Sequence, residues 1–315
     1  MTRVARGPGR AGHTRAMPAP PPFDPLRAAT ARLAALGLAA LGLAPLVLAA
    51  CTHAPSPATD AQRLALAVRS RPVVLLGETH DNAAQHALRA EALRTLLAAG
   101  ARPALLMEQF DREHQPAIDR ALAGPNPTVD DVLAAGAPDP ASVRSGWDWR
   151  FYRPYLALAL AHRLPIVAAN VSRADARRAV QGGLASIGFE PGVPADVQRV
   201  QTQAIVDGHC GAIGPGDAGP MVAAQVARDQ FMARAIEANG ARGVVLIAGN
   251  GHVRRDIGVP RWLGAAARAR SVSIGLLEAG RDTDAAAYDV VIETPAQPRA
   301  DPCADLRMPR AAPRG

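Results

Sequence analysis

The chain has 315 residues, of which 49% are hydrophobic and 20% are charged. This composition supplies a sizeable buried core and excludes a wholly disordered chain. The formal net charge is +7, but residues 1–50 hold six Arg and one Asp, which leaves +2 for the rest. Since no basic run with interleaved aromatic residues follows, we expect no nucleic-acid partner.

Residues 33–50 form an uncharged apolar run that is preceded by two Arg. A positive segment followed by an apolar one is typical of an export signal, although this run is also long enough for a membrane-spanning helix. The small residues before Cys51 resemble a bacterial lipobox, in which the Cys thiol is acylated, for example with palmitate, and becomes the new N-terminus. We therefore predict that residues 1–50 are a lipoprotein signal peptide.

The mature chain is expected to begin at Cys51, with the Pro-rich residues 51–60 as a tether. Thr52 rather than Asp follows the Cys, so the lipobox resemblance favours the outer membrane over the inner one. The predicted location is the cell envelope, on the outer membrane facing the periplasm, with the lipid anchor as the membrane contact. Either Met1 or Met17 is the start of translation.

After the tether, short apolar runs alternate with helical patterns. The runs that predict strands are residues 73–76, 104–107, 166–169, 244–248, 272–277 and, as an edge strand, 289–293. This alternation predicts an α/β fold with a mostly parallel central sheet flanked by helices. About residues 115–149 and 173–232 we expect helical insertions that form a smaller helical subdomain, and residues 304–315 should be a disordered tail.

Polar residues stand at the ends of four predicted strands. They are Glu78 and His80, then Glu108 and Gln109, then Asn170, and finally Gly249, Asn250 and His252. Because parallel strands present their carboxyl ends at one edge, where ligands bind, these side chains should gather there. Helix capping and loop bonding are the simpler interpretation for Gln109 and Asn170. A half-buried acid or imidazole needs a partner, so Glu78, His80 and His252 are a candidate divalent-metal site.

Residues 147–155 contain five of the eleven aromatic residues of the chain. One interpretation is a plug in the hydrophobic core. The other is a flat apolar wall with phenolic oxygens, which suits a planar ligand.

Acylation of Cys51 leaves two further cysteines, Cys210 and Cys303. In an oxidising compartment such a pair forms a disulfide, which would tie the C-terminal tail to the second helical insertion. The alternative is a reactive thiol at Cys210, beside His209, and an oxidising periplasm disfavours it.

Several short motifs occur in order between residues 70 and 303. They include LGETHDN at 76–82, MEQFD at 107–111, WDW at 147–149, DGHCG at 207–211 and AGNGHVR at 248–254. Together they resemble the ChaN-type haem-binding lipoproteins, a family linked to iron uptake. The resemblance implies that residues 61–303 form a haem-binding domain, built as a parallel sheet with a smaller helical part.

The wider superfamily includes erythromycin esterases and Tiki-type metalloproteases. Its Gly-Glu-x-His opening falls on Glu78 and His80 of this sequence, and its late Gly-x-x-His falls on Gly249 and His252. Thr79 departs from the pattern, because many relatives carry a basic residue there. This departure leaves the ligand less defined than the fold.

A haem site needs an apolar slot, an axial ligand for iron and cations for the propionates. The predicted haem-binding residues are Tyr152 or a His as axial ligand, with His209 among the site residues, and Arg153, Arg228 and Arg254 as partners of the carboxylates. The expected partners are haem, the membrane, a homodimer that shares the haem, and an outer-membrane haem receptor.

The alternative function is a hydrolase. Glu78 or His80 would activate water within the cluster that also holds Glu108 and His252, with or without a divalent metal, and Arg228 would stabilise the oxyanion. The sequence identifies no substrate for such an enzyme. A haem-binding protein without enzymatic activity is therefore the favoured interpretation.

Overall fold

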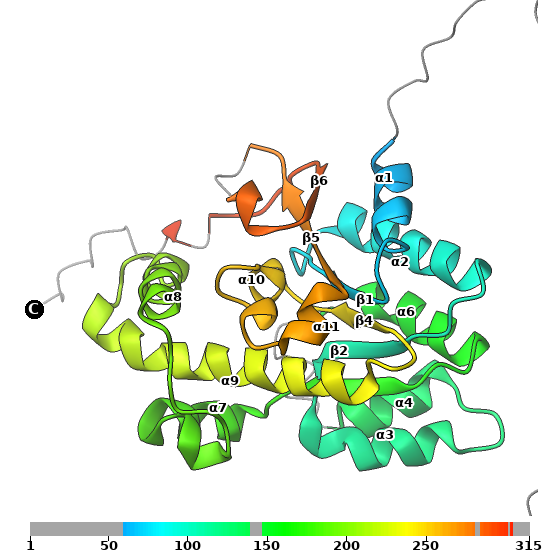
Figure 1. Cartoon of the computed structure of the whole chain (residues 1–315), viewed down its shortest axis with the longest axis horizontal. Helices are drawn as coiled ribbons and strands as arrows, with labels where there is room; N and C mark the ends of the chain where they lie inside the picture. The colour runs from blue at the N-terminus through cyan, green and yellow to red at the C-terminus, as the bar shows by residue number, and fades with distance from the viewer. Residues whose placement is uncertain (1–58, 139–146, 281–283, 302, 305–315) are drawn as a thin grey trace, which may run out of the picture. The chain divides into compact units, whose positions relative to one another are not determined.

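The computed structural model describes residues 59–138, 147–280, 284–301 and 303–304 (Figure 1). In this part of the chain six strands form one sheet, all parallel, in the order β3-β2-β4-β1-β5-β6. The strands are β1 (Val73–Leu76), β2 (Ala104–Asp111), β3 (Ile166–Asn170), β4 (Val244–Ile247), β5 (Ser271–Glu278) and β6 (Val290–Thr294). The apolar runs of Val, Leu and Ile form strands because both faces of the sheet are covered.

Successive residues of a strand point to opposite faces, so each strand contributes to two cores. Val74 and Leu76 of β1 belong to the core beneath α1, α2 and α6, whereas Val73 and Leu75 belong to the core beneath the second half of α9. The helices between these strands are α1 (Asp60–Ala67), α2 (Ala83–Ala98), α3 (Gln115–Leu122), α4 (Val129–Gly136), α6 (Trp149–Ala161), α7 (Arg173–Gly182), α8 (Ala195–Gly208), α9 (Pro215–Asn239), α10 (Asn250–Val253) and α11 (Ala265–Ala269).

Helices α7 and α8 pack on the first half of α9 around a third core. Ala179, Val197 and Val226 are fully buried in it, one from each helix. The second half of α9 instead places Met232 and Ile236 against the sheet. The long helix α9 therefore carries residues of the second predicted insertion onto the face of the sheet (Figure 1).

The predicted fold class is confirmed, because the apolar runs form a parallel sheet flanked by helices. Residues 290–294 occupy the edge, as expected for the last run. Strand β2 continues to Asp111, four residues beyond its predicted end at Met107, because its later residues still pair with β3. The exact domain boundaries remain predictions.

The export signal, Cys51 and the tether up to residue 58 lie outside the described residues, as does the tail from residue 305. Among the helices that are described, none combines the length and the apolar character needed to cross a membrane.

A disulfide joins Cys210, just after α8, to Cys303 near the C-terminus. The Cα atoms of the two residues are 5.6 Å apart, and 93 positions separate them in the sequence. A cross-link that closes so long a loop restricts the unfolded chain strongly. The cysteines thus connect the tail to the second helical insertion.

Gly77 lies where β1 leaves the sheet, and its position leaves no room for a side chain. A Cβ atom there would lie 2.8 Å from Val253 Cγ2 and 3.0 Å from the backbone oxygen of Ile274. We predict that Gly77→Ala lowers the free energy of unfolding by about 1–3 kcal/mol, measured by urea denaturation. Gly192→Ala is the control, because a Cβ there meets nothing within 4 Å. Equal stability of both variants would contradict the packing described.

Candidate functional site

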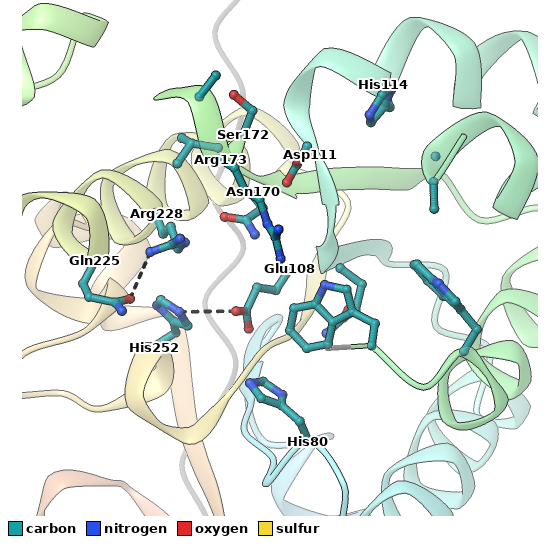
Figure 2. A pocket seen from close by; sticks show the side chains of 17 residues that line it. His80, Glu108, Asp111, His114, Asn170, Ser172, Arg173, Gln225, Arg228 and His252 are labelled. Atoms are coloured by element: carbon teal, nitrogen blue, oxygen red, sulfur yellow. Dashed lines mark hydrogen bonds and ion pairs between the residues drawn. The ribbon is translucent and has the colours of Figure 1, made fainter. Parts of the chain in front are cut away.

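The four strand ends that carry polar residues belong to four neighbouring strands. In the order β3-β2-β4-β1, they supply Asn170, Glu108, His252 and His80. Figure 2 shows these side chains pointing toward one space beyond the sheet. The sheet order therefore gathers residues that are far apart in the sequence, as the strand-end rule predicts.

Glu78 is a buried carboxylate at the centre of the network. Its Oε1 accepts hydrogen bonds from His80 Nδ1, at 2.7 Å, and from the hydroxyl of Tyr152. Its Oε2 is paired with the guanidinium of Arg89, which is completely buried, and lies 3.8 Å from His86 Nδ1. A buried carboxylate is stable only with such compensation, so Glu78 holds α2, α6 and the loop after β1 together.

His80 is fixed on one side and open on the other. Because the carboxylate of Glu78 accepts from Nδ1, the neutral ring has its lone pair on Nε2. Nε2 has no hydrogen-bond partner among the described residues, and the side chain is 44% exposed. Trp147 packs edge-on against the ring, with the centroids 4.6 Å apart. Partial desolvation lowers the pKa of His80, with an opposing effect of Glu108, so the imidazole is neutral near pH 7.

His252 is held between two carboxylates. Its Nδ1 lies 2.6 Å from Asp229 Oδ1, and its Nε2 lies 3.4 Å from Glu108 Oε1. Burial alone would lower the pKa of His252, but Glu108 and Asp229 together raise it to about 10. The ring is therefore an imidazolium at neutral pH.

The negative charge of Glu108 compensates the positive charge of His252. Its Oε2 accepts the backbone N–H of Gly249 at 2.8 Å. Burial works to raise the pKa of Glu108, but His252, His80 and the Gly249 N–H outweigh it and lower the pKa to about 2. Two imidazoles at the same sheet edge thus carry different charges, because two acids outweigh the burial of His252, whereas burial is the largest influence on the pKa of His80.

Two cavities adjoin this cluster. The larger has a volume of about 620 Å³ and lies against Trp147, Trp149, Asn170 and Arg228. The second has a volume of about 540 Å³ and lies between α8, α9 and the loops after β1 and β4. His80, Gln225 and His252 line both cavities, so the two histidines stand where the cavities meet.

The larger cavity has a cationic side. Arg173 and Arg228 line it, and no carboxylate of the described residues forms an ion pair with either guanidinium. Arg228 donates instead to Gln225 Oε1 at 3.4 Å. Asp111 lines the same cavity, and burial raises the pKa of its carboxyl while Arg228 and Arg173 act to lower it. An anionic group would find two available guanidinium groups here.

The structure places Tyr152 in the core, away from the lining of both cavities. Its ring has no solvent exposure, and its hydroxyl donates to Glu78 rather than facing either cavity. Burial raises the pKa of the Tyr152 phenol, which disfavours the tyrosinate that iron would bind. The aromatic segment instead divides its roles: Tyr152 and Tyr155 are core residues, while Trp147 and Trp149 line the larger cavity.

Two arginines that were predicted to bind the haem carboxylates, Arg153 and Arg254, pair with acidic residues of the protein. Arg153 pairs with Asp130 at 2.6 Å, and Arg254 pairs with Asp256 at the same distance. Neither arginine lines either of the two cavities described above. His209 lines the second cavity, with its Nδ1 donating to the backbone oxygen of Ile205.

Glu78, His80 and His252 are the residues predicted to bind a divalent metal, and this site stays a prediction. No group of three His, Cys, Asp or Glu side chains that could hold a metal ion is found within the described ranges. Both nitrogens of His252 face carboxylates.

Sequence reasoning missed Asp229, Arg89 and Arg173. Asp229 lies in the middle of α9, with no strand end to mark it. Arg89 had a detectable signal, because it stands in helical register with Leu93 and Leu97, and a charge on an apolar helix face indicates a buried partner. Arg173 begins α7 directly after the end of β3, where helix-capping residues are common.

The fold and site define a parallel α/β protein with a Glu/His cluster and a cavity beyond the strand ends. The family described as "Haem-binding uptake, Tiki superfamily, ChaN" matches residues 64–263, and the chain belongs to this family. No curated protein sequence matches the chain.

Three solved structures show different degrees of similarity to this chain, and the first of them shares its fold. ChaN of Campylobacter jejuni, described with cofacial haem binding, is 19% identical over 72% of this chain and 89% of that one, with a TM-score of 0.59. The type III effector HopBA1 is 18% identical over 76% of this chain and 95% of that one, with a TM-score of 0.47. An erythromycin esterase, EreC, is 13% identical over 69% and 72%, with a TM-score of 0.38.

We predict that His252 keeps its proton well above pH 7. Because the folded pKa of about 10 exceeds the usual 6.5, its contribution to stability is complete below pH 6.5 and is lost as the pH rises through 10. Unfolding free energies should fall between these limits by up to about 1.4 kcal/mol per pH unit. Asp229→Asn should flatten the slope, since the amide keeps the hydrogen bond without the charge. A His252 resonance that titrates below pH 7 would contradict this account.

Proposed function

We propose that this protein binds haem in the larger cavity, with His80 as the axial ligand of the iron. The observation that carries the proposal is the orientation of His80. Its Nδ1 is bonded to Glu78, and its unpartnered Nε2 lies beside the cavity. Histidine ligands of metals commonly donate the other ring N–H to a carboxylate, which fixes the ring and raises its basicity.

The cavity fits such a ligand in size and lining. Its volume of about 620 Å³ lies within the range of roughly 300–1,000 Å³ of cofactor sites. Trp147 and Trp149 supply aromatic surface for a planar ring system. Figure 2 shows Arg173 on the side of the cavity opposite His80, where carboxylates of the same ligand would be paired.

Bound haem would supply an iron centre that accepts an imidazole nitrogen and two propionates that accept guanidinium hydrogen bonds. The residues of this chain orient those contacts. Glu78 holds the proton on Nδ1 of His80, and Arg228 and Arg173 add positive charge at the other side. The imidazolium of His252 lies beside His80 and is balanced by Glu108 and Asp229, so the cluster itself adds little net charge.

We predict that the purified full-length protein binds haemin saturably and that His80→Ala weakens this binding by about tenfold or more, as expected for loss of an axial ligand worth at least ~1.4 kcal/mol. The Soret band should shift on binding in the wild type. His114→Ala is the matched control, because His114 also lines the cavity but does not contact Glu78.

Arg228→Ala should weaken haemin binding less than His80→Ala and should leave the Soret maximum unchanged, because it removes a carboxylate partner and not the iron ligand. Wild-type protein that shows no saturable haemin binding would remove the proposal. Tyr152→Phe changing the Soret band while His80→Ala does not would assign the iron to the phenol instead.

A second candidate function rests on the same pair of residues. His80, oriented by Glu78 and with Nε2 free, has the arrangement of a general base, and the imidazolium of His252 lies close by. This arrangement favours a hydrolase of the kind found in the wider superfamily. Ester hydrolysis by haem-free protein that disappears in His80→Ala, without haemin binding, would favour this candidate.

We also propose that the protein is anchored by lipid to the outer membrane and acts in haem uptake. The lipobox-like end of the apolar run at Cys51 supports the anchor, and the Cys210–Cys303 disulfide suits an oxidising compartment. Palmitate should label the wild type in cells, and Cys51→Ala should abolish the label. Equal labelling of the two proteins would contradict lipidation at this residue.

A further inference from the structure

In the C-terminal segment, residues 295–301 form no regular helix or strand, yet two strong contacts hold the segment in place. One is an arginine, Arg299, that reaches the loop between β1 and α2. The other is the disulfide of Cys303 with Cys210, just beyond the end of α8. Both attachment points belong to elements that build the site, because the loop carries His80 and α8 lines the second cavity.

Arg299 joins two carboxylates at once. Its Nε and one Nη donate to the two oxygens of Asp81, at 2.7 and 2.6 Å. Both of its Nη atoms donate to the carboxylate of Glu278, each at 2.7 Å. Asp81 follows His80 directly in the sequence, and Glu278 ends β5. A guanidinium can make two such bidentate contacts, whereas an ammonium group cannot.

The carboxylate of Glu278 also organises its surroundings. It accepts Asn82 Nδ2 at 2.7 Å and the backbone N–H of Gln297 at 3.0 Å, and Asn82 Nδ2 donates as well to the oxygen of Pro295. These bonds join the loop, the last part of β5 and the C-terminal segment. The hydrogen bond from Arg299 is the largest influence that lowers the pKa of Glu278 to about 2, so this carboxylate stays ionised.

Other bonds also hold the backbone of the loop that carries His80. His86 Nε2 donates to the oxygen of His80 at 2.9 Å, and the Asn82 N–H donates to the oxygen of Thr79 at 2.9 Å. The Thr79 N–H donates to Gln85 Oε1 at 2.6 Å, and the Asn250 N–H donates to the oxygen of Glu78 at 2.9 Å. These bonds hold the inner part of the loop. Arg299 is the residue that bonds the side chain following His80, and it links this side chain to the end of β5.

We propose that Arg299 is a positioning residue for His80, and that the Cys210–Cys303 disulfide keeps the segment bearing Arg299 in place. For haem this inference rests on the proposed function, but its effect on the loop does not. Loss of either contact frees the outer end of the loop and lowers the fraction of molecules in which the Nε2 atom of His80 faces the cavities.

The disulfide makes the arrangement sensitive to reduction. A dithiol such as dithiothreitol would transfer two electrons and two protons to the Cys210–Cys303 bond, giving two cysteine thiols while the reagent closes to its own cyclic disulfide. The segment would then keep the contacts made by Arg299, Asn82 and the Gln297 N–H but lose its covalent link to the end of α8. Reduction and loss of Arg299 should therefore affect the same loop.

Hydrogen–deuterium exchange on the full-length, haem-free protein tests the positioning directly. We expect peptides covering residues 77–82 to exchange about tenfold faster in Arg299→Ala, the loss expected for roughly 1.4 kcal/mol of local stability. Arg299→Lys should give an intermediate rate. Arg63→Ala is the matched control, because Arg63 also ties a helix to the last strand, through the oxygen of Val291, but makes no contact with this loop.

The disulfide is tested by adding dithiothreitol and, separately, by replacing Cys210 and Cys303 together with Ser. Both should raise exchange in residues 77–82 by a smaller factor, with β1 and β4 unchanged. Unchanged exchange of the loop in Arg299→Ala would overturn the positioning role. An effect of Arg299→Ala without any effect of reduction would overturn the role of the disulfide.

Haemin titration supplies the second measurement. Arg299→Ala should weaken binding severalfold without shifting the Soret maximum, because the ligand stays the same and only its placement suffers. Wild-type protein that binds no haemin would defeat the proposed function, while the exchange data would still decide on the positioning. Loss of protection throughout the chain in Arg299→Ala, as in a globally destabilised protein, would also overturn the inference.

Discussion

The buried carboxylate of Glu78 is the interaction on which the site depends. A charge this far from water needs partners, and Glu78 has Arg89 from α2, Tyr152 from α6 and His80 from its own loop. The three contacts fix two helices relative to the end of β1. They also determine which nitrogen of His80 is protonated, and therefore which one is available to a ligand. The carboxylate of Glu78 therefore determines both the packing of the core and the nitrogen of His80 that is available to a ligand.

A second carboxylate–imidazole network stands beside the first, and its ring is positively charged whereas that of His80 is neutral. His252 is protonated because Glu108 and Asp229 both face it. His80 is neutral because partial burial lowers the pKa of its ring, although Glu108 acts against this. The site therefore offers one lone pair, on His80, where the two cavities meet, while the charge of His252 is compensated within the protein by Glu108 and Asp229.

The sequence predicted the sheet and the gathering of Glu78, His80, Glu108 and His252, because apolar runs mark parallel strands and strand ends meet at one edge. It could not predict side-chain direction within the aromatic segment, since helical spacing does not distinguish a core tyrosine from one that faces a cavity. For this reason the sequence indicates Tyr152 as an axial ligand of the haem iron and Arg153 as a partner of a haem carboxylate. In the structure Tyr152 donates to Glu78 and Arg153 pairs with Asp130. Such pairs depend on packing between elements that are distant in the sequence.

The central claim is that Nε2 of His80, oriented by Glu78, binds the iron of haem. Pulsed electron paramagnetic resonance of the ferric complex, with ¹⁵N-labelled histidine in the protein, measures this bond directly. The account predicts a hyperfine coupling to one strongly bound histidine nitrogen that is lost in His80→Ala and retained in His114→Ala. A haem complex that shows no histidine coupling, or whose coupling survives His80→Ala, would contradict it.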